Sequence, residues 1–327
     1  MKNGWKIFFK CFGFLAIFIG IYAYMCFVLL PKDEKDLGYS KYYSAQSIKY
    51  EKNNTLDFIF YGNSDLYNGY SPMDFYEQTG STSFAIGAGR QTVKRIKAQI
   101  KDNLKKQKPQ AVIIETDCFY TQNIAMGGSF QYDVAPIIAP FKYHARWKEL
   151  EAKDLYQKPG NKRPKKCFKG FLYETKNSHY KPDPNFMQTD IDGVKEIQKS
   201  VKTDIKEIVS MCNKRGVKVV LLTLPSANTW TMPKHNAVEK IAKDNNLLYL
   251  DLNVKKEDFN FDFANSFRDW GNHMNYYGAK QSTDYIVKFL NSNFELQNHK
   301  EDKKYESWND LLLTFQDYKN KHQGVYE

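Results

Sequence analysis

The feature that most constrains this chain is an uncharged apolar run over residues 11–30, CFGFLAIFIGIYAYMCFVLL. An α-helix rises about 1.5 Å per residue, so about 20 such residues cross the hydrocarbon core of a bilayer. Three lysines precede the run, whereas residues 32–36 carry mixed charges that nearly cancel. Because basic residues flank a membrane helix on its cytoplasmic side, we predict a single-pass anchor, with the N-terminus in the cytoplasm and the remaining chain outside.

A cleavable signal peptide is the competing interpretation of this run. The run is long for a signal peptide and no small-x-small cleavage site follows it, which favours an uncleaved anchor. We therefore divide the chain into a cytoplasmic end with its anchor, a polar stalk, a folded domain and a tail. Their predicted bounds are 1–31, 32–54, 55–292 and 293–327.

Short apolar runs alternate with amphipathic stretches through the predicted domain. Strands are predicted where the runs are continuous, at 58–61, 82–86, 111–114, 217–224 and 247–250. Helices are predicted from their periodicity over 92–107 and 194–212. Two more are predicted over 233–246, which has a proline near its start, and over 276–291. Strands that are apolar throughout are typical of a parallel sheet covered on both faces. We therefore predict an α/β fold with three layers, α/β/α, around a parallel five-stranded sheet.

Two stretches fall outside this alternation. Residues 118–187 contain Gly127 and Gly128, several prolines and a basic run at 162–166, and we interpret them as an insertion or lid with little regular structure. In the tail, apolar side chains recur on one helical face, at Trp308, Leu311, Leu312 and Phe315. We expect this face to dock on the domain rather than on a partner.

The basic composition narrows the classes of partner. A net charge of +11 suits an anionic membrane, an anionic polymer, nucleic acid or merely a solvated surface. The basic residues are scattered and no zinc-finger or helix-turn-helix pattern is present, so we do not expect nucleic acid. The five cysteines show neither CxxC nor metal-ligand spacing, so we expect no metal, no cofactor and no disulfide framework.

Polar residues follow the predicted strands at the ends where ligands bind in parallel α/β sheets. These residues are Ser64, the loop 87–91, the stretch 115–117 and Ser226. The loop after the fifth strand carries Asp269 and His273. All five sites are therefore expected to meet at one edge of the sheet.

Ser64, His273 and Asp269 are the residue types that nucleophilic acyl transfer needs. A serine hydroxyl reacts only when a base removes its proton, and a carboxylate must orient that base. Each residue also has a structural interpretation, because a serine before a helix is usually a cap and an isolated histidine is usually a surface residue. Cys118 is a weaker candidate nucleophile, since a thiol after an apolar strand is usually buried.

The oxyanion that develops in acyl transfer needs preorganised donors. The candidates are the backbone N–H groups of Ser64 and Gly87 and the side-chain amide of Gln91, although Gln91 also fits the start of a helix. Asn63 and Asp117, beside the ends of the first and third strands, are further candidates for contact with the substrate.

These residues resemble the SGNH (GDSL-type) hydrolase family over roughly residues 55–292. Gly62-Asn63-Ser64 resembles its first block, the Gly87 region its second, and DWGNHMNYYGA its last block with the Asp and His. Glu115-Thr116-Asp117 stands where the family has Gly-x-Asn-Asp, so the usual oxyanion asparagine is absent. Asp269 lies one residue further from the histidine than the family's aspartate, and Asp262 is the weaker substitute.

The resemblance implies a flavodoxin-like, SGNH-type sheet and a serine esterase or O-acyltransferase. The single anchor is similar to that of the DltD, AlgJ and PatB type of members. Those members work with a membrane-bound O-acyltransferase to move acetyl or D-alanyl groups onto cell-envelope polysaccharide or teichoic acid. Two alternatives stay open, an inactive SGNH-like scaffold or binding protein, and a basic protein that merely adheres to anionic polymer.

Overall fold

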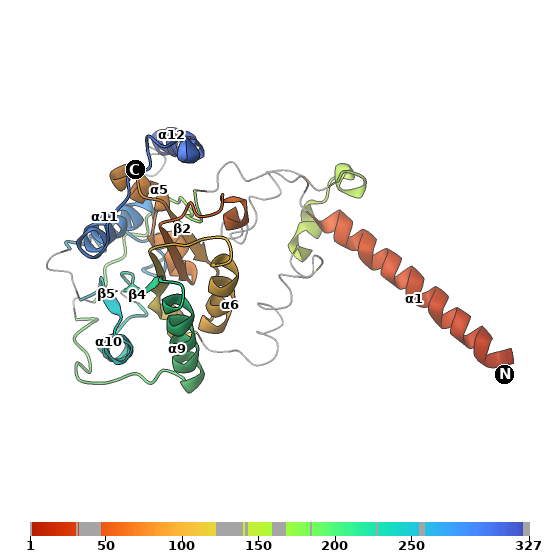
Figure 1. The fold of residues 1–327 in the computed structure, drawn as a ribbon, viewed down its shortest axis with the longest axis horizontal. Helices are drawn as coiled ribbons and strands as arrows, with labels where there is room; N and C mark the ends of the chain where they lie inside the picture. The colour runs from red at the N-terminus through yellow and green to blue at the C-terminus, as the bar shows by residue number, and fades with distance from the viewer. Residues whose placement is uncertain are drawn as a thin grey trace. The chain divides into compact units, whose positions relative to one another are not determined.

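Five short strands form one parallel sheet in the computed structural model (Figure 1). The strand order is β2-β1-β3-β4-β5, and each neighbouring pair is parallel. The strands are β1 Phe58–Gly62, β2 Ser83–Gly87, β3 Ala111–Glu115, β4 Lys218–Thr223 and β5 Leu248–Asp251. The predicted α/β fold with a parallel five-stranded sheet is therefore confirmed.

The structure describes residues 2–30, 32, 47–121, 140, 143–158, 168–183, 185–226, 228–254 and 259–322. The chain divides into two compact units. One unit combines residues 1–39 with 123–164, and the other, which holds the sheet, combines residues 40–122 with 165–327.

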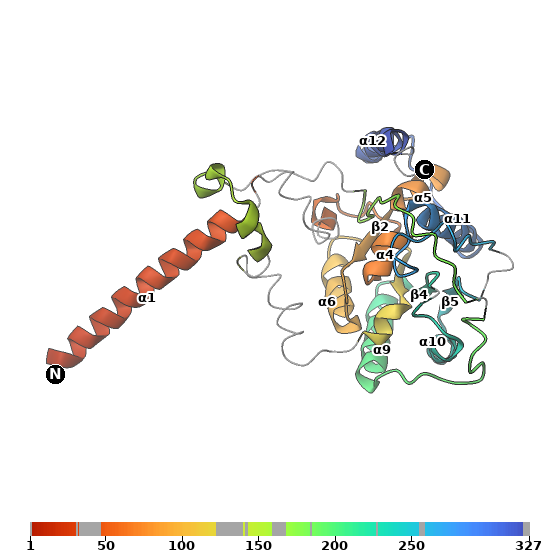
Figure 2. The same ribbon diagram turned by 180° about the vertical axis from the view of Figure 1, so that it is seen from behind.

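Helices cover both faces of the sheet. Successive side chains of a strand point to opposite sides, and here both sides are apolar. In β1, Ile59 and Tyr61 pack into one core and Phe58 and Phe60 into the other. The first core receives α6 Val93–Asn103, α9 Lys199–Asn213 and α10 Met232–Asp244. The second receives α4 Ser64–Gly69, α5 Pro72–Thr79 and α11 Tyr276–Asn293 (Figures 1 and 2). Single-turn 3-10 helices are η1 Ser47–Tyr50, η2 Thr116–Tyr120 and η6 Lys303–Tyr305.

Two helix predictions need correction. No helix was predicted between the first two strands, but this stretch forms α4 and α5. Asn63 and Ser71 cap these helices through their side chains, and a proline occupies the first turn of α5. The helix predicted over 194–212 begins only at Lys199, although Ile197 before it is buried in the core.

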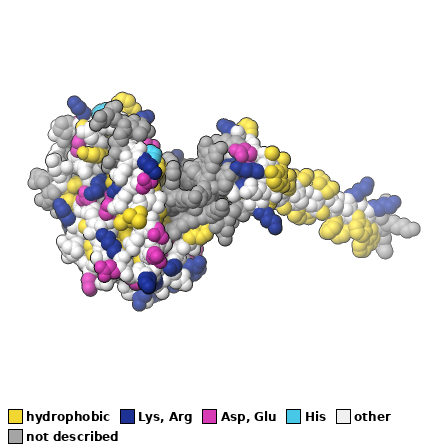
Figure 3. Space-filling view, turned by 90° about the horizontal axis from the view of Figure 1, so that it is seen from above, with side chains coloured by type: hydrophobic (Ala, Val, Ile, Leu, Met, Phe, Trp, Pro, Cys, Tyr) yellow, Lys and Arg dark blue, Asp and Glu magenta, His cyan; other side chains and the backbone are white. Residues whose placement is uncertain are grey.

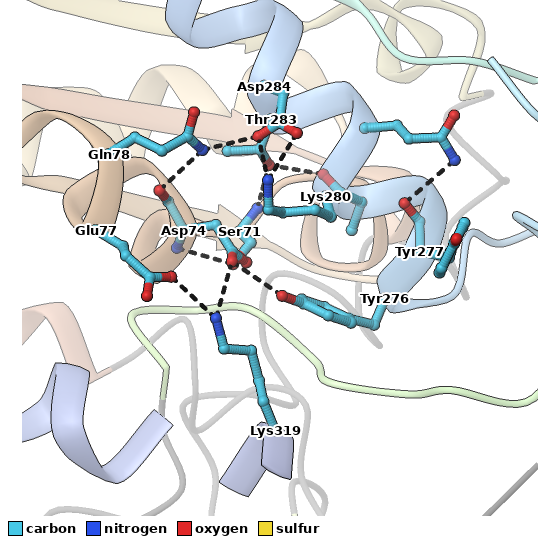
Figure 4. Close-up of polar contacts among 12 residues, drawn as sticks. Ser71, Asp74, Glu77, Gln78, Tyr276, Tyr277, Lys280, Thr283, Asp284 and Lys319 are labelled. Atoms are coloured by element: carbon cyan, nitrogen blue, oxygen red, sulfur yellow. Dashed lines mark hydrogen bonds and ion pairs between the residues drawn. The ribbon is translucent and has the colours of Figure 1, made fainter. Parts of the chain in front are cut away.

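The tail docks on the α/β unit, as predicted. Trp308 of α12 Glu306–His322 is buried, with its ring 5.2 Å from that of Tyr76 in α5. Figure 4 shows Asp74 of α5 between Tyr276 of α11 and Lys319 of α12. Its Oδ1 accepts a hydrogen bond from the Tyr276 hydroxyl at 3.0 Å and lies 3.4 Å from the Lys319 Nζ. Burial raises the pKa of Asp74.

Described parts of the predicted stalk and insertion belong to the α/β unit. The Lys169 ammonium is fully buried and lies 2.9 Å from both carboxylate oxygens of Glu51 and 3.8 Å from the Trp308 ring. The backbone N–H of Ala85 in β2 donates to the Lys169 carbonyl at 2.9 Å. Gly170 follows with φ 99°, and a Cβ there would lie 1.8 Å from the Ala85 oxygen. A buried lysine needs a carboxylate partner, and no local pattern reveals one 118 residues away.

The other unit contains α1 Lys2–Leu29 and two 3-10 helices, η4 His144–Glu149 and η5 Ala152–Leu155. Residues Gly4–Leu29 are long and apolar enough to cross a membrane. Apolar side chains are exposed along α1, and basic side chains gather at its N-terminal end (Figure 3). Residues 122–139, 141–142, 159–167 and 184 of the predicted insertion, with its Gly127–Gly128 pair and its basic run, lie outside the described residues.

Candidate active site

Ser64 stands at the junction of β1 and α4. The Asn63 side chain caps α4 by accepting a hydrogen bond from the Asp65 backbone N–H at 2.8 Å. The Ser64 carbonyl accepts from the Asn68 amide at 2.6 Å. Gly62 permits the close approach of Glu115 at the end of β3, because a Cβ there would lie 2.6 Å from the Glu115 Cβ. The local sequence therefore places the serine at the carboxyl end of a central strand.

A short loop before α11 holds Asp269 and His273 together. Carboxylate oxygen Oδ1 of Asp269 accepts the His273 backbone N–H at 2.6 Å, and Oδ2 lies 2.6 Å from His273 Nδ1. The Asn272 amide nitrogen lies 2.9 Å from the same Nδ1. Asp262, the alternative carboxylate, instead accepts from the Asn265 amide at 2.8 Å. Asp269, and not Asp262, is thus the carboxylate that contacts the His273 ring.

The serine and histidine segments meet, although about two hundred positions separate them. Met274, which follows His273, packs against α4, where a Cβ on Gly69 would lie 2.3 Å from the Met274 Cε. The charge of Asp269 also reaches Asp65, the neighbour of Ser64, and helps to raise its pKa. Among the described residues the Ser64 hydroxyl has no hydrogen-bond partner, so a direct bond to His273 is not formed in this conformation. Catalytic hydrogen bonds are often long in unliganded enzymes.

Carboxyl groups crowd the floor of the site. Glu115 is buried, and one of its oxygens accepts the Asp117 backbone N–H at 2.8 Å. Burial, reinforced by the negative charge of Asp117, raises the pKa of Glu115 well above its usual range. The same two causes raise the pKa of Asp65 to about 8. At neutral pH Asp65 is therefore largely protonated, which limits the negative charge beside Ser64.

Asp117 positions other groups of the site. Its Oδ2 accepts from the Asn63 amide at 2.9 Å, and its Oδ1 lies 3.3 Å from the Lys234 Nζ. The Lys234 ammonium was not singled out from the sequence, because it comes from α10, far along the chain. Asn63 and Asp117, both predicted at the site, thus form one hydrogen-bonded unit there.

Gly87 and Gln91 support the turn from beneath. A Cβ on Gly87 would lie 2.9 Å from the Asn63 carbonyl oxygen. The fully buried Gln91 amide donates to the Gly62 carbonyl at 3.0 Å and to the Ile86 carbonyl at 3.3 Å. Both amide hydrogens of Gln91 are therefore engaged in joining the ends of β1 and β2, and neither is free to donate to a substrate in this conformation.

Two other predicted groups do not reach Ser64 through any hydrogen bond in the described residues. Cys118 is buried, its thiol donates to the Glu115 carbonyl at 2.8 Å, and burial raises its pKa well above the usual range. Such a thiol is a poor nucleophile. Ser226 follows β4, and its hydroxyl lies 2.8 Å from that of Thr229.

The site has an exposed aromatic residue that the sequence analysis missed. Trp270, between Asp269 and His273, is 74% exposed, and its backbone adopts φ 59°. Its N–H donates to the Ser178 hydroxyl at 3.0 Å, and its carbonyl accepts from the Asn228 amide at 2.6 Å. A positive φ is rare for a bulky residue, and strain of this kind clusters at ligand sites. The sequence offered one signal for this residue, a tryptophan between the predicted aspartate and histidine of the DWGNH stretch.

A second histidine–aspartate pair lies at the end of β5. Asp251 Oδ2 receives the Trp230 indole N–H at 2.8 Å, the Tyr249 hydroxyl at 3.0 Å and His235 Nδ1 at 2.8 Å. This convergence satisfies a buried carboxylate, and no serine hydroxyl hydrogen-bonds to this histidine within the described residues. Nor does any group of three or more metal-ligating side chains occur in the part of the chain that the structure describes.

No protein-family model and no curated protein matches the chain. Solved structures with a similar arrangement include a GDSL-like lipase from Bacteroides thetaiotaomicron, with 12% identity, a TM-score of 0.39 and coverage of 76% of this chain and 95% of that one. A lipase/acylhydrolase from Enterococcus faecalis has 11% identity, a TM-score of 0.39 and coverage of 74% and 98%. The psychrotrophic esterase EstA from Pseudoalteromonas has 14% identity, a TM-score of 0.37 and coverage of 72% and 99%. Similarity at this level does not assign an activity to this chain.

Proposed function

We propose that the protein is a membrane-anchored serine esterase or O-acyltransferase with Ser64 as its nucleophile. The observation that carries this proposal is the Asp269–His273 pair, which a short loop places against α4, the helix that begins at Ser64. A carboxylate on Nδ1 fixes the histidine tautomer whose Nε2 is a base.

The reaction follows from these groups. His273 Nε2 takes the Ser64 proton as Oγ attacks the acyl carbonyl, and Asp269 stabilises the imidazolium that forms. The imidazolium then gives its proton to the leaving alkoxide, and an acyl-serine remains. Water or an acceptor hydroxyl attacks the acyl-serine, His273 takes the proton from the attacking group, and Ser64 finally recovers a proton.

The oxyanion is assigned to backbone donors. We assign it to the Ser64 and Gly87 N–H groups, which belong to neighbouring segments at the ends of β1 and β2. Asn63 and Asp117 hold this turn in place, and Gln91 joins the strands below it. The protonated state of Asp65 keeps an additional charge away from the developing oxyanion.

The choice of acyl group and acceptor rests on the resemblance of the sequence motifs. We propose acetyl or D-alanyl groups on cell-envelope polysaccharide or teichoic acid, and a membrane-bound O-acyltransferase as partner. An acyltransferase must keep water from the acyl-serine, whereas an esterase must admit it.

Retention of the anchor is supported by the contacts at its end. The Arg146 guanidinium, which is buried, donates to the Leu29 and Leu30 carbonyls at 2.9 Å each and to Asp154 at 2.8 Å. Cleavage after the apolar run would remove these backbone acceptors from a buried cation. We therefore propose that α1 remains in the mature protein, with the α/β unit on the non-cytoplasmic side.

The decisive experiment is hydrolysis of p-nitrophenyl acetate by the full-length protein in detergent. Loss of activity in both Ser64→Ala and His273→Ala is expected, with Ser226→Ala, in the segment after β4, as the matched control. Equal activity in wild type and Ser64→Ala would overturn the assignment of the nucleophile.

An inactive scaffold is the second candidate, favoured by the engaged Gln91 amide and the missing bond between Ser64 and His273. A fluorophosphonate probe separates the two. Labelling of wild type but not of Ser64→Ala supports the enzyme, whereas no labelling of either supports the scaffold.

A further inference from the structure

Residues 143–158 pack around the C-terminal end of α1. Arg146 donates to the last carbonyls of the helix, and the Tyr24 hydroxyl donates to the Leu155 carbonyl at 3.3 Å. Val28 and Leu29 are buried, whereas the apolar side chains between Trp5 and Ile21 are largely exposed. Figures 1 and 2 both show this segment beside the end of α1 that is remote from the N-terminus. The segment therefore contacts one end of the apolar helix, whereas the apolar side chains nearer the N-terminus stay exposed.

The proposed anchor fixes the depth of this segment. The uncharged run ends at Leu30, which places that residue near the boundary of the hydrocarbon core. Tyr24 lies six positions earlier, about 9 Å along the helix axis. Because Tyr24 and Leu30 both contact the segment, residues 143–158 must lie at the level of the lipid headgroups and the outermost acyl carbons.

The exposed side chains of the segment suit that level. Trp147 is 65% exposed, Leu155 52% and Tyr156 74%. Tryptophan and tyrosine prefer the membrane interface, where an apolar ring and a polar edge both find partners. Exposed Lys148 and Lys158 would meet anionic headgroups.

The charged groups inside the segment face one another instead. Arg146 and Asp154 are both buried and lie 2.8 Å apart. This pairing neutralises the inner charges, and the outer surface carries Trp147, Leu155 and Tyr156 beside the exposed lysines. In water such a surface would be costly, because it buries none of its large apolar side chains.

We propose that residues 143–158 form a membrane-interface collar, which rests on the lipid bilayer through Trp147, Leu155 and Tyr156. This inference depends on the proposed anchor, because the collar reaches the bilayer only if α1 lies in the membrane. The exposed side chains of the collar contact the lipid headgroups on the non-cytoplasmic side.

The test uses the full-length protein in vesicles of phosphatidylcholine and phosphatidylglycerol. The emission of Trp147 is obtained as the difference between wild type and Trp147→Phe. Brominated lipids labelled near the headgroup should quench this emission at least about twofold more than acrylamide does, because interfacial tryptophans contact lipid. The matched control is Trp270, which is also exposed but lies in the α/β unit. Its emission, from wild type minus Trp270→Phe, should be quenched by acrylamide.

The outcomes separate the collar from the anchor. If Trp147 is quenched by acrylamide and not by bromolipid while the protein floats with carbonate-washed vesicles, the collar is refuted and the anchor stands. If carbonate releases the protein from vesicles, the anchor fails and the collar fails with it. Neither outcome depends on the Ser64 chemistry, which p-nitrophenyl acetate reports separately.

Discussion

Replacement of Asp269 by asparagine is expected to abolish most activity through the tautomer of His273. In the wild type, Asp269 accepts both the His273 backbone N–H and a proton on Nδ1, each at 2.6 Å. Asparagine has one carbonyl oxygen, and the backbone N–H claims it. The new amide nitrogen then faces Nδ1 together with the Asn272 amide, which already lies 2.9 Å away. Two donors convert Nδ1 into an acceptor, so the imidazole proton moves to Nε2.

An imidazole protonated on Nε2 cannot take the Ser64 proton. In serine proteases the same change lowers kcat by about 10⁴, and we expect a loss of about 10³ to 10⁴ here. This loss corresponds to about 4 to 5.4 kcal/mol of activation free energy at 1.36 kcal/mol per decade. The free energy of unfolding should change by less than about 1 kcal/mol, because the pair is not buried and exposed ion pairs contribute little.

The assay is p-nitrophenyl acetate hydrolysis beside urea denaturation of each variant. The sharpest control moves the carboxylate, since Asn272→Asp in the Asp269→Asn background places an acceptor beside Nδ1 again. We expect this double variant to be at least about tenfold more active than Asp269→Asn alone, because it restores the tautomer whose Nε2 is a base. If Asp269→Asn keeps more than about a tenth of wild-type activity, His273 does not depend on this contact and the reasoning is wrong.

Three further predictions, each with a control, test other parts of the structure. In wild type, kcat/KM should fall as pH rises through about 8, because the raised pKa keeps Asp65 neutral below that value and its ionisation adds charge beside Ser64; in Asp65→Asn this alkaline limb should disappear, and its persistence would assign the limb to another group. Trp270→Ala should raise KM for a polymeric substrate with little effect on kcat, whereas Trp270→Phe should retain the wild-type KM; an unchanged KM in the alanine variant would exclude a substrate contact. Trp308→Ala should lower the free energy of unfolding by about 3–5 kcal/mol in urea titrations, whereas Leu313→Ala, exposed on the same helix, should change it by less than about 0.5 kcal/mol; similar losses in both would mean that α12 is not docked.

The sequence predicted the features that repeat locally. Continuous apolar runs predicted all five strands, and periodicity predicted α6 and the docking face of α12. Helices α10 and α11 were also predicted. The short helices α4 and α5 were missed, because each depends on a single capping side chain rather than on periodicity. The contact between Asp269 and His273 was foreseeable, since four positions separate the two residues.

Contacts between distant segments could not be predicted, because they leave no local pattern in the sequence. The Lys169–Glu51 pair and the Lys234–Asp117 pair each join residues more than a hundred positions apart. The engagement of Gln91 by two strand carbonyls depends on the registration of β1 and β2, which only the folded sheet defines. Charged and amide side chains serve either structure or chemistry according to such neighbours, so their roles could not be assigned beforehand.

The segment around Gly170 has a consequence for how copies of this protein behave in solution. β2 is the terminal strand of the sheet, and a terminal strand offers unpaired backbone groups to any passing chain. The Lys169 carbonyl occupies the Ala85 N–H on that edge, and only a glycine at 170 allows so close an approach. A variant with alanine at 170 would expose this template and promote strand-to-strand aggregation. The return of the chain from its insertion therefore protects the solubility of the whole fold.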